Sequence, residues 1–439
     1  MSELNPITKT REFGGAIGAL TLIIFLPLIT LFLHLACNEK YISQGFTLEL
    51  DTIRKIFDEE ILINWRSLLF NVDCWKFYLS WFFGLAVLDV FVPGTEMFGV
   101  ELRDKTKLKY NINGIQLVGF LMAVISARFY MYGFNLPELN FLYDHFATMM
   151  ITTWEFSVIL SFLVYFFSFV PLKKLNGLGT KERILSVNGN SGNPIFDWFI
   201  GRELNPRIGE WDIKLFCELR PGLLLWLLLN LSCVQKQFQT LGYITNSMIL
   251  VNVFQFIYII DGVLNEEGCL TMMDITTDGF GFMLAFGDLC WVPFCYCLQS
   301  RYLALVEINL PTVAVISIIL LNILGFYIFK ASNNQKNYFR QGRVPHLKSI
   351  ETERGTKLLV DGWWGISQHI NYFGDMLIAL SWCLPTGFNT VLTYFYFIYF
   401  TSLLIHRQTR DEEKCRNKYG KAWEEYEKKV PYKIIPYLY

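Results

Sequence analysis

Residues 361–375 hold an unusual density of side chains that could do chemistry. Two tryptophans, a histidine, an asparagine, a tyrosine and two aspartates occur there, between apolar segments on both sides. Polar groups at membrane depth are costly unless they face a cavity or one another, so the stretch predicts a functional site. The alternative is a loop at the membrane surface that contributes to an aromatic belt.

The C-terminal tail repeats polar and aromatic side chains at helical spacing. Asp411, Cys415 and Tyr419 recur every four residues and Tyr426 follows seven later, so one helical face would hold all four. A neighbouring basic stripe is formed by Arg407, Arg410, Lys414 and Lys418.

Another basic pair, Lys336 and Arg340, precedes residues 361–375. The two residues are four positions apart, which is about one helical turn. Two basic patches beside aromatic and amide side chains suit a ligand with phosphates at one end and a flat ring at the other. The alternative is a positively charged anchor against anionic lipid. That alternative does not explain why tyrosines and a cysteine share the face.

Residues 265–288 form an acidic segment in apolar surroundings. No lysine or arginine follows these acids until Arg301. Buried carboxylates without cations tend to hold a proton near neutrality, which is what a general acid requires. A solvated lumenal loop is the equally weighted alternative. The acids are Glu266, Glu267, Asp274, Asp278 and Asp288.

Two other motifs have structural interpretations. Arg202, Glu203 and Arg207 alternate with aromatics, and we expect them to pair charges where a loop packs on the membrane part. Gly279-x-Gly281 lacks the third glycine and the flanking strand and helix of a dinucleotide-binding βαβ unit, which excludes that fold.

The composition predicts an all-α polytopic membrane protein. The chain has 439 residues, of which 53% are hydrophobic, and its mean hydropathy is +0.34. A net charge of -1 gives no basis for nucleic-acid binding. Ten cysteines without a C-x-x-C pair indicate buried apolar side chains in a reducing compartment, and five histidines argue against a metal centre.

We expect about ten transmembrane helices, and nine apolar runs approach the length of a membrane span. They cover residues 13–36, 76–93, 115–134, 147–171, 221–236, 246–264, 305–331 and two segments within 374–405. We divide the chain into N-terminal transmembrane helices (1–171), a hydrophilic loop (172–220) and a catalytic transmembrane region with the tail (221–439).

Two long motifs, residues 192–207 and 404–420, resemble signatures of the membrane sterol reductases. That family includes sterol C-14 reductases, 7-dehydrocholesterol reductases, the fungal C-24(28) reductase and the membrane domain of the lamin B receptor. The likeness covers nearly the whole chain and is greatest to the fungal C-14 reductases of ergosterol synthesis, notably over residues 261–268 and 430–436.

The resemblance implies an NADPH pocket built from the last part of the chain. The position before His369 is commonly arginine in relatives but is Gln368 here, so one basic contact differs. The matching cofactor-binding positions are Lys336, Arg340, Leu359, Trp364, Asn371, Tyr372, Asp411, Cys415, Arg416, Asn417, Lys418, Tyr419 and Tyr426.

The implied reaction is reduction of the 14,15 double bond of a sterol 8,14-diene. An acid delivers a proton, at C15, and hydride from NADPH quenches the cation at C14, so a dry pocket with a buried acid is needed. The candidates are Asp288, Asp274, Asp278 and Glu266 as acid or support, and Tyr296, with Trp291 and Phe294, in the sterol-facing wall.

The expected surroundings follow from the same resemblance. A sterol substrate, the lipid bilayer and other sterol-biosynthesis enzymes are the candidate partners. The expected location is the endoplasmic reticulum membrane, with several spans and the NADPH site open to the cytosol.

Three other functions remain open. A related sterol reductase would act at C-7 or C-24(28). A membrane methyltransferase for isoprenylcysteine has a similar basic tail, but leaves residues 205–207 and 265–288 unexplained. A scaffold like the lamin B receptor would need a long basic N-terminal extension, whereas about twelve residues precede the first span here.

Overall fold

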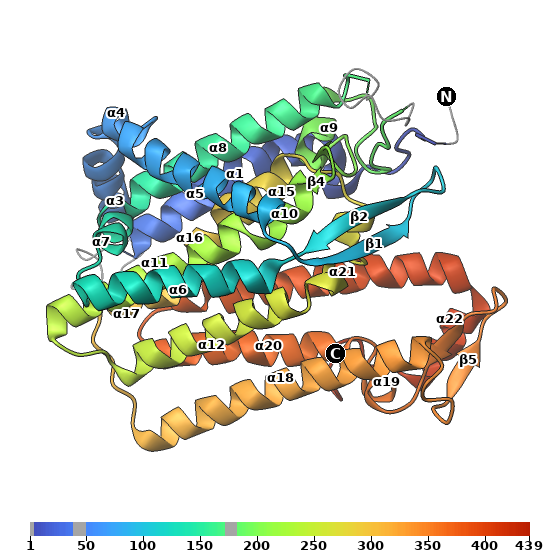
Figure 1. Ribbon diagram of the computed structural model, residues 1–439. Coiled ribbons are helices and arrows are strands. Elements are labelled where there is room, and N and C mark those ends of the chain that lie inside the picture. Colours follow the sequence, from blue (N-terminus) through green and yellow to red (C-terminus); the bar gives the residue numbers. More distant parts are fainter. Residues whose placement is uncertain (1–3, 38–49, 172–181) are drawn as a thin grey trace. The chain divides into compact units, whose positions relative to one another are not determined.

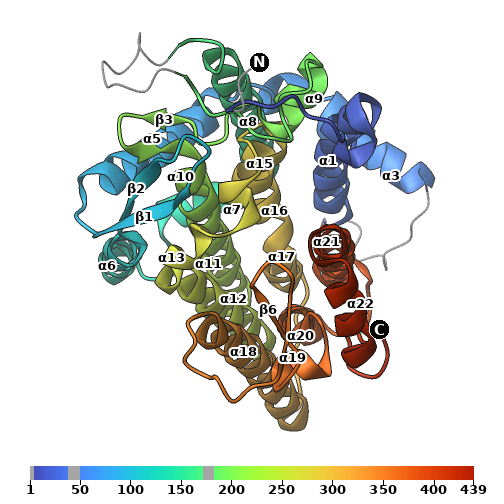
Figure 2. The ribbon, with the colours of Figure 1, turned by 90° about the vertical axis from the view of Figure 1, so that its right-hand side faces the viewer.

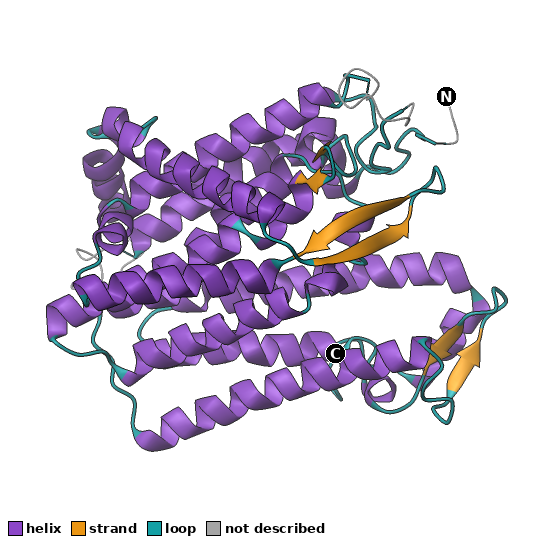
Figure 3. Cartoon of the chain, in the orientation of Figure 1, coloured by secondary structure: helices purple, strands orange, loops and turns teal. Residues whose placement is uncertain are grey.

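The computed structural model describes residues 4–37, 50–171 and 182–439 as a helical chain with a few short strands (Figures 1 and 3). Within these ranges, eight helices are long and apolar enough to cross a membrane. The prediction of a helical polytopic membrane protein is therefore confirmed. The eight candidate spans are Glu12–Ala36, Trp65–Phe91, Gly114–Tyr132, Phe146–Phe167, Ile213–Leu241, Asn246–Leu264, Phe282–Leu305 and Thr312–Arg340.

The chain divides into two compact units. Unit 1 comprises Met1–Ile244 and Gln255–Val306, and unit 2 comprises Thr245–Phe254 and Glu307–Tyr439. Helix α12 (Asn246–Leu264) contributes to both. The other helices of unit 1 are α1 (Gly15–Ala36), α3 (Leu50–Ile56), α4 (Trp65–Leu68), α5 (Val72–Phe91), α6 (Gly114–Tyr132), α7 (Pro137–Asp144), α8 (Phe146–Phe167), α9 (Pro194–Ile200), α10 (Ile213–Leu219), α11 (Pro221–Leu241), α13 (Glu266–Cys269), α14 (Met273–Thr276), α15 (Phe282–Phe286), α16 (Val292–Tyr296) and α17 (Leu298–Leu305).

Unit 2 contains fewer and longer helices. Its longest, α18, has 29 residues and ends in charged residues that follow the apolar run. The elements of unit 2 are α18 (Thr312–Arg340), β5 (Ser349–Glu351), β6 (Lys357–Leu359), α19 (Trp363–Ile366), α20 (Ile370–Cys383), α21 (Phe395–Tyr419) and α22 (Lys421–Lys429). Helices α20 and α21 occupy the two apolar segments predicted within 374–405.

Local sequence signals explain where the central helices begin and end. The Asn71 side chain accepts hydrogen bonds from the backbone N–H groups of Asp73 and Cys74 and so caps α5. Helix α11 begins with Pro221, which needs no backbone donor there, and ends at Leu241, where Gly242 with its positive φ of 79° caps the last turn.

Three two-stranded antiparallel sheets complete the fold. In unit 1, β1 (Thr95–Glu101) pairs with β2 (Lys107–Ile112), and β3 (Arg207–Ile208) pairs with β4 (Trp211–Asp212). Figure 2 shows the β1–β2 hairpin beside the starts of α6 and α10. In unit 2, β5 pairs with β6.

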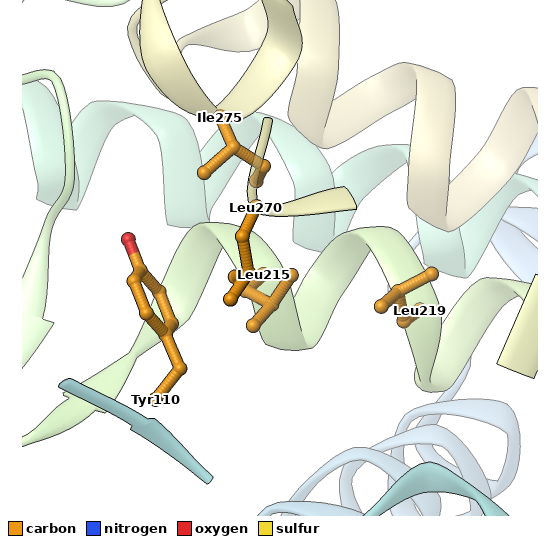
Figure 4. Packing of buried hydrophobic residues seen from close by; sticks show 5 residues of the cluster. All are labelled: Tyr110, Leu215, Leu219, Leu270 and Ile275. Atoms are coloured by element: carbon orange, nitrogen blue, oxygen red, sulfur yellow. The ribbon is translucent and has the colours of Figure 1, made fainter. Parts of the chain in front are cut away.

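A buried apolar cluster attaches the β1–β2 hairpin to the acidic segment. Tyr110 of β2 packs with Leu215 and Leu219, one turn apart on α10, and with Leu270 and Ile275 from the acidic segment (Figure 4). Because one cluster joins three segments that are distant in sequence, it fixes the position of residues 265–278.

The predicted span boundaries were wrong in three places. The span expected at 221–236 begins at Ile213, because α10 precedes α11 with only Arg220 between them. The span expected at 305–331 begins at Thr312. Phe282–Leu305 was not predicted as a span, because glycines, a proline and a π-helical turn at Gly287–Trp291 interrupt its periodicity.

Two loops of unit 1 cross backbone to backbone at glycines. A Cβ atom on Gly201, whose φ is +96°, would lie 2.4 Å from the Gly279 carbonyl carbon and from the Gly281 nitrogen. Phe280, between these two glycines, donates its backbone N–H to the Glu203 carbonyl at 3.1 Å. Gly279 and Gly281 therefore allow the two loops to cross in close contact.

We predict that Gly201→Ala lowers the free energy of unfolding by about 2–4 kcal/mol, because the new methyl group collides with backbone and the φ is unfavourable. Thermal unfolding of the detergent-purified protein measures the loss. Gly262→Ala is the control, because no atom lies within 4 Å of the added methyl group. Equal melting temperatures for the two variants would contradict the prediction.

Candidate functional site

Helices α18 and α20 of unit 2 approach closely at two glycines. A Cβ atom on Gly374 would lie 2.7 Å from the Phe329 backbone nitrogen, and one on Gly325 would lie 2.9 Å from the Gly374 carbonyl oxygen. Side chains larger than hydrogen would separate the helices. This close approach brings the charged end of α18 beside the first turn of α20.

A cation and polar groups gather where these helices meet α19. The Lys336 ammonium lies 3.7 Å from the centre of the Trp364 ring, and the indole N–H of Trp364 donates to the Ser332 carbonyl at 2.8 Å. Asn371 donates to Asn333 at 3.3 Å, while its own Oδ1 is buried without a hydrogen-bond donor among the described residues. The buried Leu359 packs with Trp364. The Asn371 Oδ1 is therefore able to accept a hydrogen bond from a ligand N–H.

His369 forms the next part of this surface. Its ring stacks on Tyr372 with centroids 4.8 Å apart, and its Nε2 lies 3.8 Å from Asp411 Oδ2. Burial lowers the pKa of His369 to about 4, although Asp411 opposes this shift. The imidazole is therefore neutral near pH 7.

The tail continues the surface but as two helices. Helix α21 ends at Tyr419, and Gly420, with a φ of 51°, separates it from α22. The prediction that Tyr426 shares one helical face with Asp411 is therefore wrong. Tyr426 of α22 nevertheless packs in one apolar cluster with Cys415 and Tyr419, because the break folds α22 back.

Other predicted cofactor positions in the tail are more exposed. Arg416 forms ion pairs of 2.9 Å with both Glu412 and Glu427, and the Lys418 ammonium lies 4.9 Å from the Tyr419 ring centre. Asn417 is exposed, and so is Arg340 at the end of α18. The role of these residues in cofactor binding remains a prediction.

Gln368 hydrogen-bonds to the backbone of the C-terminal segment. Its side-chain amide donates to the Val430 carbonyl at 2.8 Å, and its backbone N–H donates to the Tyr432 carbonyl at 2.9 Å. His369 N–H donates to the Lys433 carbonyl at 2.8 Å. Residues 430–433 are thus fixed beside the start of α20.

In unit 1, Glu266 is paired, contrary to the expectation for the acidic segment. Arg220 donates to Glu266 and also to Asp89, the latter at 3.0 Å, and the Arg220 and Glu266 side chains are only 3% and 1% exposed. The Gly114 N–H donates to the second Glu266 oxygen at 2.9 Å. The charge of Glu266 is therefore compensated by a cation and a backbone donor.

Lys214 fixes the rest of the acidic segment. Its fully buried ammonium donates to the carbonyl oxygens of Asp274, Ile275 and Asp278 at 2.6, 3.0 and 2.8 Å. The Asp278 carboxylate also accepts a hydrogen bond from Asn188 at 3.1 Å. The backbone of 274–278 therefore satisfies an ammonium that would otherwise be costly to bury.

Asp288 lies in the π-helical turn that precedes α16. Its Oδ2 is buried and has no hydrogen-bond donor among the described residues. Lys214, Glu218 and Asp274 interact with it electrostatically. A buried carboxyl oxygen without a hydrogen-bond donor is energetically costly, which distinguishes Asp288 from the paired Glu266. The Tyr296 ring, two turns further on, packs edge to face on Trp226 at 5.4 Å.

Arg202, Glu203 and Arg207 have structural partners, as predicted. Arg202 donates to the Ser168 carbonyl at 2.8 Å, and Glu203 accepts from the buried Arg183. Arg207 pairs with Asp212 at 3.0 Å and stacks 4.4 Å from the Tyr110 ring centre. These contacts tie residues 202–212 to neighbouring loops and strands.

Sequence reasoning missed Lys214 and Arg220, which hold the acidic segment, and Glu218, which interacts electrostatically with Asp288. Lys214, Glu218 and Arg220 precede it by more than 40 residues, and no local spacing links them to Glu266 or Asp274. The available signal was that three of the four charges in the span 213–241 lie in its first eight residues, where buried charges need partners.

Comparisons with known proteins cover the full chain. The family model described as "Ergosterol biosynthesis ERG4/ERG24 family" matches residues 7–439. The Delta(14)-sterol reductase ERG24 of Candida albicans is 58% identical, over 100% of this chain and 99% of the relative. The Delta(14)-sterol reductase ERG24 of Saccharomyces cerevisiae is 55% identical over both full lengths. The Delta(14)-sterol reductase LBR of Gallus gallus is 43% identical, over 98% of this chain and 64% of the relative.

We predict a pH dependence of unfolding that His369 causes. Its pKa is about 4 when folded and near 6.5 otherwise, so the unfolded chain binds the proton first as the pH falls. The free energy of unfolding should therefore drop by up to about 3 kcal/mol between pH 6.5 and 4. His369→Gln should remove this part of the drop, measured as the difference between the two proteins' melting curves. Parallel curves would refute the assignment.

We also predict that Lys214→Met lowers the free energy of unfolding by about 3–5 kcal/mol, because three buried carbonyl groups lose their donor. Thermal unfolding measures the change. Lys76→Met is the matched control, since Lys76 pairs with Asp73 at an exposed position. A loss no greater than that of the control would show that the carbonyl groups do not need the ammonium.

Proposed function

Because the chain belongs to the ERG4/ERG24 family of ergosterol biosynthesis, we propose that it reduces the C14–C15 double bond of sterol 8,14-dienes with NADPH. The observation that carries the proposal is the 58% and 55% identity, over the whole chain, to two relatives named Delta(14)-sterol reductase. The polytopic helical structure fits a substrate that resides in the bilayer.

The cofactor is assigned to unit 2. NADPH, when bound, supplies the hydride. Lys336 and Arg340 provide positive charge for its phosphates, Trp364 and Leu359 provide an apolar wall, and the unpaired Asn371 Oδ1 accepts a hydrogen bond. Tyr372 and the tail residues Asp411, Cys415, Arg416, Asn417, Lys418, Tyr419 and Tyr426 complete the proposed set.

The reaction also needs a proton at C15, because an electron-rich, unactivated diene accepts hydride only after protonation. Among the candidates, Asp288 is favoured, since its buried Oδ2 has no donor within the described residues. Glu266 is assigned a structural role, because Arg220 compensates its charge. Asp274 and Asp278 support the acid through the segment that Lys214 holds. Tyr296 stays in the proposed sterol-facing wall.

Location and partners extend the proposal. We place the protein in the endoplasmic reticulum membrane with the cofactor side toward the cytosol, where NADPH is available. The sterol substrate enters from the lipid phase, and other enzymes of sterol biosynthesis are candidate neighbours. These assignments rest on the family.

The test incubates membranes that contain the protein with a sterol 8,14-diene and NADPH, followed by gas chromatography and mass spectrometry of the sterols. NADPH-dependent loss of the 14,15 double bond is expected. Reduction of a 7-ene or 24(28)-ene instead would keep the family but assign the protein to a different double bond. No reduction of any of these sterols would favour a scaffold function.

Asp288→Asn should lower turnover by at least about 100-fold, because the amide cannot deliver a proton, while NADPH binding measured by fluorescence stays unchanged. Glu267→Gln, on the same acidic segment but exposed, is the control. Undiminished turnover in Asp288→Asn would remove this residue from the mechanism.

A further inference from the structure

A cavity of about 570 Å³ lies in unit 1 where three candidate spans start or stop. One span ends at Phe91, and the others begin at Gly114 and Ile213, so the cavity opens at the level of the membrane boundary. Its walls come from the end of α5, the β1–β2 hairpin, the β3–β4 turn and α10. A cavity of this size accommodates a small molecule or a lipid headgroup.

The lip of the cavity is apolar. Phe91 and Ile208 are 78% and 67% exposed there. Inside, Tyr110, Trp211 and Phe216 supply aromatic rings, and the Trp211 indole N–H donates to Asp89 at 2.9 Å. Tyr110 is fixed by the cluster of Figure 4. Exposed apolar residues at the lip suit acyl chains, and fixed aromatic rings suit an ammonium group.

The charges of the cavity are unbalanced. Lys109 lies 2.6 Å from Glu96 and 3.7 Å from Glu210, so two carboxylates share one cation. Arg220 is likewise shared between Asp89 and Glu266, and Arg207 neutralises Asp212. Five lining carboxylates are thus matched by two lining cations and by Arg207, which pairs with Asp212 but does not line the cavity, so two negative charges are in excess. A positively charged group is favoured and a net anion is repelled.

One donor in the wall still lacks an acceptor. Arg220 is 3% exposed, and its Nη1 has no hydrogen-bond acceptor among the described residues. A ligand that carries an acceptor oxygen next to a positive group would complement both the carboxylates and this guanidinium. A sterol offers one neutral hydroxyl and would leave the charge excess uncompensated.

We propose that this cavity binds the headgroup of a zwitterionic phospholipid. The choline or ethanolamine ammonium lies among the carboxylates and aromatic rings, the phosphate faces Lys109 and Arg220, and the acyl chains pass over Phe91 and Ile208. Such a lipid would brace the β1–β2 hairpin against α5 and α10, independently of the reaction that the protein catalyses.

The test uses native mass spectrometry of the full-length protein, purified in detergent and stripped of lipid. Dioleoylphosphatidylcholine should bind at least about tenfold more tightly than dioleoylphosphatidylglycerol. Glu96→Gln combined with Glu210→Gln should reduce that preference about tenfold, because the charge excess disappears. Both side chains are exposed, at 66% and 79%, so the double variant should fold normally.

Glu101→Gln is the matched control, because Glu101 belongs to the same hairpin, pairs with Lys105 and does not line the cavity. Its lipid preference should equal that of the wild type. Equal binding of the two lipids by the wild type, an unchanged preference in the double variant, or displacement of phosphatidylcholine by ergosterol would each overturn the proposal.

Discussion

Arg220 makes the interaction on which unit 1 depends. Its guanidinium joins Asp89 at the end of α5 to Glu266 at the start of the acidic segment, and Glu266 in turn accepts the first N–H of α6. Each of these charges would be costly if buried alone, so removing any member would strand the others. Asp89, Arg220 and Glu266 also line the cavity of unit 1. One buried charge network therefore sets the positions of two membrane helices, a helix junction and a candidate ligand site.

The helix packing of unit 2 depends instead on two glycines, which have no side chains. The close contact of Gly325 with Gly374 lets α18 and α20 meet without intervening atoms, and the polar ends of both helices then converge on Trp364 and Asn371. Small residues are the usual means of close helix approach in membranes, where no hydrophobic force drives helices together. The cofactor surface is built on this contact, so its geometry is set several residues away from any group that would touch a ligand.

The sequence predicted those features that local spacing controls. Apolar runs predicted membrane spans, and helical periodicity brought together Asp411, Cys415 and Tyr419 on α21. The prediction from periodicity treated the tail as one continuous helix, however. It therefore placed Tyr426 on the same helical face as Asp411, although the chain breaks at Gly420. It also treated Glu266 as unpaired, because its partner Arg220 lies 46 residues earlier. Contacts at that separation depend on how the helices pack, and local residue spacing does not predict this packing.

The contact of Lys214 with residues 274–278 has a consequence for biosynthesis. Asp274 lies 60 residues after Lys214 in the chain. At translation rates of about 5–20 residues per second, the ammonium is synthesised about 3–12 s before its acceptor carbonyls. During that interval it needs water or lipid phosphate at the bilayer surface. The second residue of α10 therefore lacks its buried acceptors until the downstream acidic segment has been made.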